Sequence, residues 1–251
     1  MPSSDPRAGS RDRPHAPGPV AADVIIPAYQ EAPNVGRVVQ VALAAGLGRV
    51  LVIDDGSTDG TTAAARAAGA EVLSLPSNRG KGGALVAGAN ACTREVVVML
   101  DADLVGLRPE HVVALAEPVC GGWADMARGT FEGGRWRTTA AQHVAPQLNG
   151  QRAVRRELLL AVPDLEGSRY GVEVAITLYA AAEGWRCVSV PLEGVSQVMK
   201  EEKLGFWRGF RVRLAMYGDI VATLLRARRS AKPGTRTAAH DRARGEEVER
   251  K

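Results

Sequence analysis

The fold of this chain is decided by residues 96–103, which read Val96-Val97-Val98-Met99-Leu100-Asp101-Ala102-Asp103. A short apolar run rich in valine is typical of a strand that is buried on both faces, as in a parallel sheet. Residues two apart on an extended chain point the same way, so Asp101 and Asp103 can act on one target. Carboxylate oxygens suit Mg²⁺ or Mn²⁺, although a DxD segment taken alone is more often a solvated acidic turn.

Outward from this segment, short apolar runs alternate with alanine-rich helical stretches. Strands are predicted at residues 24–26, 50–53, 71–75, 96–100 and 187–190, and helices at 32–45, 61–68, 81–92 and 109–119. This order predicts an α/β fold, a mostly parallel sheet flanked by helices, in which ligands bind at the carboxyl ends of the strands. Two more helices are predicted at 151–161 and 170–183. Residues 121–147 show no clear period and are predicted to form a substrate-facing loop.

A polar or glycine-rich segment follows each of the first four predicted strands. In chain order they read Pro27-Ala28-Tyr29-Gln30-Glu31, Asp54-Asp55-Gly56-Ser57-Thr58-Asp59-Gly60, Ser77-Asn78-Arg79-Gly80-Lys81-Gly82-Gly83 and Asp101-Ala102-Asp103. Because the carboxyl ends of parallel strands meet at one edge of a sheet, these segments are expected to line one ligand cleft.

Two of these segments also have a purely structural interpretation. Residues 54–59 are typical of an Asx turn that leads into a helix cap. That interpretation explains Gly56 and Asp59 better than it explains the pair Asp54-Asp55, which could bind the base or the ribose. Residues 79–83 open a predicted helix, where backbone N–H groups and Lys81 favour a diphosphate. A flexible basic turn explains this second segment about equally well when it is taken alone.

Charged residues further along the chain are candidates for the acceptor side of a site. Arg152 and Arg156 are four residues apart on the predicted helix 151–161, so they would share a face suited to a phosphate. Glu173 lies in apolar company at the head of the predicted helix 170–183, where it could serve as a base or organise a leaving group. The alternatives are a solvated helix face for the arginines and a salt-bridged helix N-terminus for Glu173.

Together these motifs resemble those of family 2 glycosyltransferases with the GT-A fold, over about residues 22–209. The matching segments are 24–31, 53–59, 78–82, 99–103 and 150–156. The branch that they resemble most contains polyprenyl-phosphate sugar synthases and glucosyl-3-phosphoglycerate synthases. Tyr170-Gly171-Val172-Glu173 is similar to a catalytic-region motif of the second group.

The resemblance implies a role for each matching residue. The nucleotide-sugar side would comprise Pro27, Ala28, Glu31 and Asp55 around the nucleoside with Asp54 nearby, Lys81 on the diphosphate and Asp101 on the ribose. Asp103 would hold the Mg²⁺ or Mn²⁺ ion, and Glu173 would be the carboxylate on the acceptor side. Both of these residues would be catalytic. Arg152 and Arg156 would face the phosphate of the acceptor.

The chain departs from the family pattern in two places. Relatives commonly have a metal-ligating histidine where this chain has Gln197, whose amide oxygen can ligate Mg²⁺ but lacks the basicity of imidazole. The segment 131–147 is also shorter than in typical lipid-phosphate enzymes, which puts the acceptor class in question.

The charge distribution and the cysteine content further limit the function classes and the location that the sequence allows. Residues 226–251 carry nine basic and four acidic side chains and residues 1–20 carry three and two, so the body has a net charge of −2 although the whole chain has +4. The body therefore offers no basic face for nucleic acid. Three scattered cysteines without CxxC spacing fit a cytoplasmic protein. We expect disordered tails at 1–21 and 230–251 around one domain at 22–229.

The domain is predicted to end in an amphipathic helix over residues 206–225, followed by the basic residues Arg226, Arg228 and Arg229. The helix is predicted to pack on the domain, and the basic end leaves peripheral contact with the inner face of a membrane open. No apolar run reaches the roughly 20 residues that a membrane span needs. A homodimer is also left open.

The sequence therefore predicts a glycosyltransferase that moves a sugar from a nucleotide-diphosphate sugar to a phosphate-bearing acceptor. Polyprenyl phosphate is the first acceptor hypothesis, and a soluble acceptor such as 3-phosphoglycerate is the second. A sugar-1-phosphate nucleotidyltransferase is disfavoured, because residues 27–31 replace the long glycine-rich loop that such enzymes place after the first strand. A non-catalytic nucleotide-sugar-binding protein is the remaining alternative, and Gln197 is the residue that supports it.

Overall fold

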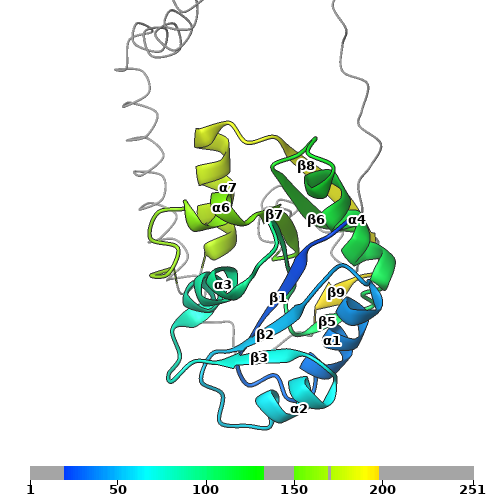
Figure 1. Cartoon of the computed structure of the whole chain (residues 1–251), viewed down its shortest axis with the longest axis vertical. Coiled ribbons are helices and arrows are strands. Elements are labelled where there is room, and N and C mark those ends of the chain that lie inside the picture. The colour runs from blue at the N-terminus through cyan, green and yellow to red at the C-terminus, as the bar shows by residue number, and fades with distance from the viewer. Residues whose placement is uncertain (1–19, 133–149, 169–170, 198–251) are drawn as a thin grey trace, which may run out of the picture.

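The computed structural model describes residues 20–132, 150–168 and 171–197, and it has the α/β architecture that the sequence predicts. A seven-stranded sheet runs through the centre in the order β3-β2-β1-β4-β7-β6-β8 (Figure 1). Its strands are β1 (Asp23–Ala28), β2 (Val50–Asp54), β3 (Glu71–Ser74), β4 (Val96–Met99), β6 (Met126–Glu132), β7 (Arg152–Arg155) and β8 (Cys187–Glu193). Only β7 runs antiparallel to its neighbours in this sheet. A small second sheet pairs β5 (Leu104–Val105) with β9 (Ser196–Gln197).

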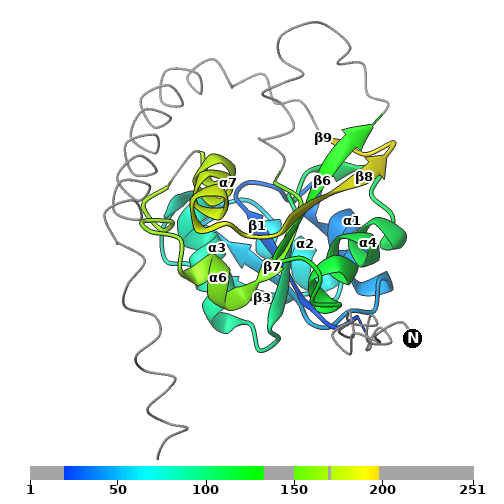
Figure 2. The ribbon, with the colours of Figure 1, turned by 90° about the horizontal axis from the view of Figure 1, so that it is seen from above.

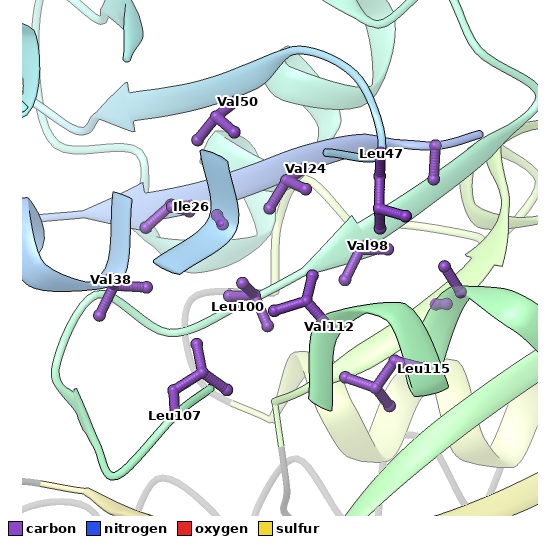
Figure 3. Packing of buried hydrophobic residues seen from close by; sticks show 14 of the residues in the cluster. Val24, Ile26, Val38, Leu47, Val50, Val98, Leu100, Leu107, Val112 and Leu115 are labelled. Carbon is purple, nitrogen blue, oxygen red and sulfur yellow. The ribbon is translucent and has the colours of Figure 1, made fainter. Parts of the chain in front are cut away.

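The helices cover both faces of the large sheet, as Figures 1 and 2 show. One layer contains α1 (Val35–Ala44), α2 (Thr61–Ala67) and α4 (Pro109–Cys120), and the other contains α3 (Gly80–Ala91), α6 (Arg156–Leu160) and α7 (Val172–Glu183). Alternate strand residues feed the two layers, because side chains along a strand point to opposite faces. Thus Val24, Val98 and Leu100 pack under α1 and α4 (Figure 3), whereas Ile25 and Val97 pack under α3.

The close approach of α3 to the sheet depends on Gly88. A Cβ added at Gly88 would lie 2.7 Å from Cγ2 of Ile25 and 3.0 Å from Cγ1 of Ile53, both in buried strands. We expect Gly88→Ala to lower the free energy of unfolding by about 1–2 kcal/mol, because overpacking outweighs the gain in helix propensity. Urea unfolding measures this difference.

Gly36 in α1 provides the matched control. The nearest atoms to an added Cβ there are 3.8 Å away, which is ordinary contact. Gly36→Ala should therefore raise the free energy of unfolding by about 0.5–1 kcal/mol through helix propensity alone. Equal effects at the two positions would contradict the packing that we describe for α3.

Two local predictions were wrong. Residues 121–147 were expected to form a loop, but Met126–Glu132 is strand β6, which pairs with both β7 and β8. Residues 151–161 were expected to form one helix, but Arg152–Arg155 is strand β7 and the helix α6 begins only at Arg156. In both cases pairing with strands distant in the chain, rather than a local sequence pattern, determines the structure.

Other predictions fall outside the described residues. These are the tails at 1–21 and 230–251 (except residues 20 and 21), most of the expected loop, and the amphipathic helix at 206–225. The domain division at 22–229 thus stays a prediction. Within the described part of the chain, no helix is long and apolar enough to cross a membrane.

Candidate functional site

A pocket of about 280 Å³ lies at the carboxyl ends of β1, β2 and β4, where the sequence predicts a ligand cleft. Its walls come from five separate parts of the chain. The lining residues are Pro27, Ala28, Tyr29, Glu31, Asp55, Lys81, Ala84, Asp101, Ala102, Asp103 and Gln197. Of the predicted site residues, Asp54, Glu173, Arg152 and Arg156 are not among them.

The wall after β1 is held by contacts to the start of α2. The backbone N–H of Glu31 donates to Oγ1 of Thr61 at 2.9 Å, and Oε2 of Glu31 accepts a hydrogen bond from Asn34 at 2.9 Å. Glu31 is buried, whereas Tyr29 is 47% exposed. This wall therefore presents an open aromatic face beside a fixed carboxylate.

Asp54 and Asp55 are both buried but are used differently. Asp54 accepts hydrogen bonds from the backbone N–H of Ser57, at 3.0 Å, and from the hydroxyl of Thr62. These contacts form an Asx turn, as one interpretation of the sequence predicted, and they direct the side chain of Asp54 toward α2. Asp55 instead reaches the start of α3 and still lines the pocket.

The glycine-rich turn before α3 uses its backbone donors internally. The N–H groups of Arg79 and Gly80 donate to the carboxylate of Asp55 at 2.7 and 2.8 Å, and the N–H of Gly82 donates to the carbonyl of Ser168 at 3.2 Å. These three N–H groups are therefore engaged, contrary to the expectation that the turn exposes them to a diphosphate. What the turn presents to the pocket is the side chain of Lys81.

Lys81 connects two carboxylates from different elements. Its Nζ lies 2.5 Å from Oδ1 of Asp101 and 2.5 Å from Oε1 of Glu173, which is in the first turn of α7. Burial lowers the pKa of Lys81, but the charges of Asp101 and Glu173 more than offset this and raise the pKa above its ordinary value. Lys81 therefore stays protonated, and it joins the pocket to α7.

Asp101 also receives two amide groups. Nε2 of Gln151 donates to Oδ2 of Asp101 at 2.9 Å, and Nε2 of Gln197 donates to the same oxygen. The pairing of β5 with β9 holds Gln197 there, since Gln197 lies opposite Leu104, just past the DxD segment. Gln151 is fully buried and was not predicted as a site residue, because a lone glutamine before a strand carries no recognisable motif.

Asp103 is the second carboxylate of the DxD segment and lies in the pocket wall, partly exposed. Among the described residues, no group of three His, Cys, Asp or Glu side chains could hold a metal ion. Mg²⁺ needs less than that, because it is usually bound through one or two carboxylates together with substrate phosphates and water. Asp103 and the amide oxygen of Gln197 fit such a partial set of oxygen ligands.

The two arginines predicted for the acceptor do not share a face. Arg152 lies on β7, is fully buried, and donates from Nη1 to Oγ1 of Thr177 in α7 at 2.9 Å. Burial lowers its pKa to about 10, and the charge of Glu173 opposes that shift. Arg156 is placed at the other end of β4, where its N–H donates to the carbonyl of Glu95. The structure thus brings Arg152 toward Glu173 and separates Arg156 from the site.

Several known proteins resemble this chain in sequence and in fold. A sequence model of glycosyl transferase family 2 matches residues 23–170. Glucosyl-3-phosphoglycerate synthase of Mycolicibacterium smegmatis is 30% identical over 238 residues, which cover 80% of this chain and 76% of that protein.

Solved structures of glucosyl-3-phosphoglycerate synthase from Mycobacterium tuberculosis are also similar. One contains Mn²⁺, uridine diphosphate and glucosyl-3-phosphoglycerate, and another contains Mg²⁺ and uridine diphosphate. Each is 27% identical with a TM-score of 0.63, and each match covers 82% of this chain and 78% of the other.

Proposed function

Because this chain belongs to glycosyl transferase family 2, we propose that it moves a sugar from a nucleotide diphosphate to a soluble, phosphorylated acceptor of the 3-phosphoglycerate type. The observation that carries this proposal is the contact of Lys81 with both Asp101 and Glu173. One cation there connects the pocket at the strand ends with the head of α7, so donor and acceptor sites would adjoin.

The pocket would take the nucleotide-sugar donor. Pro27, Ala28, Glu31 and Asp55 would surround the nucleoside, and Asp101 would face the ribose. Asp54 would act indirectly, by stabilising the turn that positions Asp55. Lys81 would contact the diphosphate, for which a protonated amine at the start of α3 is suited by charge.

A divalent ion would complete the donor site. We propose that Asp103 and the amide oxygen of Gln197 hold Mg²⁺ or Mn²⁺ together with oxygens of the diphosphate. The relatives in complex with Mn²⁺ or Mg²⁺ and uridine diphosphate support a divalent ion beside the nucleotide. When bound, such an ion neutralises the charge that develops on the departing nucleotide.

The acceptor hypothesis changes in the light of the relatives. Polyprenyl phosphate was the first hypothesis, but the relatives are named for 3-phosphoglycerate, which was the second. The short segment at 131–147 is consistent with that choice. In the proposal, Arg152 supports the acceptor side from within the fold and Glu173 is its carboxylate. Peripheral membrane contact and a homodimer stay predictions, and the cytoplasm stays the proposed location.

A panel of nucleotide sugars tests the function. Release of nucleotide is expected from one donor class, with Mg²⁺ or Mn²⁺ present, and only when 3-phosphoglycerate is added. Each reaction is repeated with polyprenyl phosphate in detergent and with EDTA in place of the metal. Tight binding of a nucleotide without any turnover across the panel would instead favour the non-catalytic alternative, with Gln197→His as the variant to test next.

A further inference from the structure

Arg128 lies directly opposite Arg152 in the antiparallel pair of β6 and β7. The N–H of Gly129 donates to the carbonyl of Gln151 at 2.9 Å, which makes the next pair, Arg128 and Arg152, of the non-hydrogen-bonded kind. In that kind of pair the two side chains approach most closely, with Cα atoms about 4.5 Å apart. Two like charges placed in this way destabilise a sheet unless an anion accompanies them.

The nearby carboxylates do not balance these arginines. Lys81 lies between Asp101 and Glu173, so the three groups together carry one negative charge. The positive charge of Arg152 balances that one negative charge, because Arg152 interacts electrostatically with both Glu173 and Asp101. Arg128 then adds one positive charge that these described residues do not offset.

Asp125 does not supply the missing anion. Its carboxylate is bound by Arg186, with contacts of 3.0 and 2.8 Å, and it also lies 3.7 Å from Arg155. These bonds lower the pKa of Asp125 to about 2, so its charge is present and already paired.

The side chain of Arg128 is itself only weakly bonded. Its Nε is buried and has no hydrogen-bond partner within the described residues. Its Nη2 lies 3.5 Å from Oγ of Ser189, which is at the limit of a hydrogen bond. Most charge-assisted hydrogen bonds are shorter, so a stronger acceptor could replace this contact.

Within the described residues, the sheet face beside Arg128 is open on the β8 side. Arg128 and Arg152 point to the face that α7 covers, as does Met126. On that face of β8, Cys187 and Ser189 are exposed. Desolvation raises the pKa of the Cys187 thiol, and the charges of Arg152 and Arg128 oppose the rise, so both guanidinium groups influence this exposed thiol.

We propose that Arg128, backed by the buried Arg152, is an anion-binding subsite that selects acceptors by a carboxylate or phosphate group. The inference rests on the proposed function, because it assigns the acceptor side of the same site. It replaces Arg156, which lies at the far end of the sheet, with a residue on the strand beside Arg152. It also defines the acceptor as a small molecule whose anionic group is separate from the hydroxyl that receives the sugar.

The kinetic test compares Arg128→Met with Arg128→Lys. Loss of a charge-assisted contact should raise the KM for 3-phosphoglycerate on the order of 10- to 100-fold in Arg128→Met and less in Arg128→Lys. The KM for the nucleotide sugar should stay unchanged in both. Arg66→Met, the same change at an exposed position on α2, is the control and should alter neither value.

Glycerol 3-phosphate and glycerate identify the group that is bound. If Arg128→Met raises the KM for 3-phosphoglycerate and for glycerol 3-phosphate alike, the subsite binds the phosphate. If it raises the KM for 3-phosphoglycerate and for glycerate but not for glycerol 3-phosphate, the subsite binds the carboxylate. An unchanged KM for all three acceptors overturns the inference and leaves the proposed function standing.

A second readout does not depend on turnover. Alkylation of the exposed Cys187, followed by peptide mapping, should be slowed several-fold by 3-phosphoglycerate or inorganic phosphate in the wild type and not in Arg128→Met. If the wild type transfers no sugar, the proposed function fails, while this protection still decides the subsite. Equal protection in the wild type and Arg128→Met, or none in either, contradicts it.

Discussion

Asp103→Asn is expected to lower kcat/KM for sugar transfer by about 10³-fold, or roughly 4 kcal/mol of transition-state stabilisation. The change removes the charge of the one carboxylate that we assign to the divalent ion. Asparagine has nearly the same shape, so the pocket wall should remain in place. The expected signature is a loss of metal-dependent nucleotide binding, measured by calorimetry with and without Mn²⁺, together with the fall in rate.

The control for Asp103 lies at the other end of the same strand. Glu95 is exposed just before β4, so Glu95→Gln makes the same change of charge away from the pocket. It should leave both nucleotide binding and rate within about twofold of the wild type, because isolated surface charges contribute little. Metal-dependent binding that survives in Asp103→Asn would remove Asp103 from the metal site.

Glu173→Gln is expected to lower kcat by about 10²- to 10³-fold, in the range of a lost catalytic carboxylate. Its Oε1 contacts Lys81 at 2.5 Å, so the substitution removes the ion pair that links the pocket to α7. The first turn of α7 should persist, because Oγ1 of Thr177 donates to the backbone carbonyl of residue 173 whatever the side chain. Nucleotide binding should therefore be nearly normal while transfer fails.

Glu117→Gln is the control for this second variant. Glu117 is exposed on α4, in the opposite helical layer, and the substitution is the same. Steady-state kinetics on the two variants separate a local effect from a general loss of charge. If Glu173→Gln keeps the wild-type kcat, Glu173 has only the structural role of a salt-bridged helix N-terminus.

The central strands β1, β2 and β4 could be predicted from the sequence because they are largely apolar on both faces. Runs such as Val50–Ile53 and Val96–Met99 have that pattern, and β2 and β4 lie within a residue or two of the predicted bounds. Strands β6 and β7 were missed because arginine and glycine interrupt them. Arg152 is a buried cation that donates a hydrogen bond to Thr177 of α7, and no local sequence pattern predicts a contact of that kind.

The same difference applies to the candidate site. The segments after β1, β2 and β4 converge because parallel strands end at one edge, so most of the pocket could be predicted from motif order. Gln151 and Arg128 could not, since each matters only through a neighbour across a strand pair or beside Asp101. The turn 54–59 had two interpretations, and both hold in part: Asp54 forms the Asx turn while Asp55 lines the pocket.

The central claim is that the sugar goes to a soluble, phosphorylated acceptor. The most direct measurement offers the enzyme both candidate acceptors at once. A radiolabelled nucleotide sugar is incubated with metal, 3-phosphoglycerate and polyprenyl phosphate in vesicles, and the label is then partitioned between water and organic solvent. We predict label in a water-soluble phosphorylated product, absent when Asp103→Asn replaces the wild type. Label that enters the organic phase instead would contradict the account and restore the lipid-phosphate acceptor.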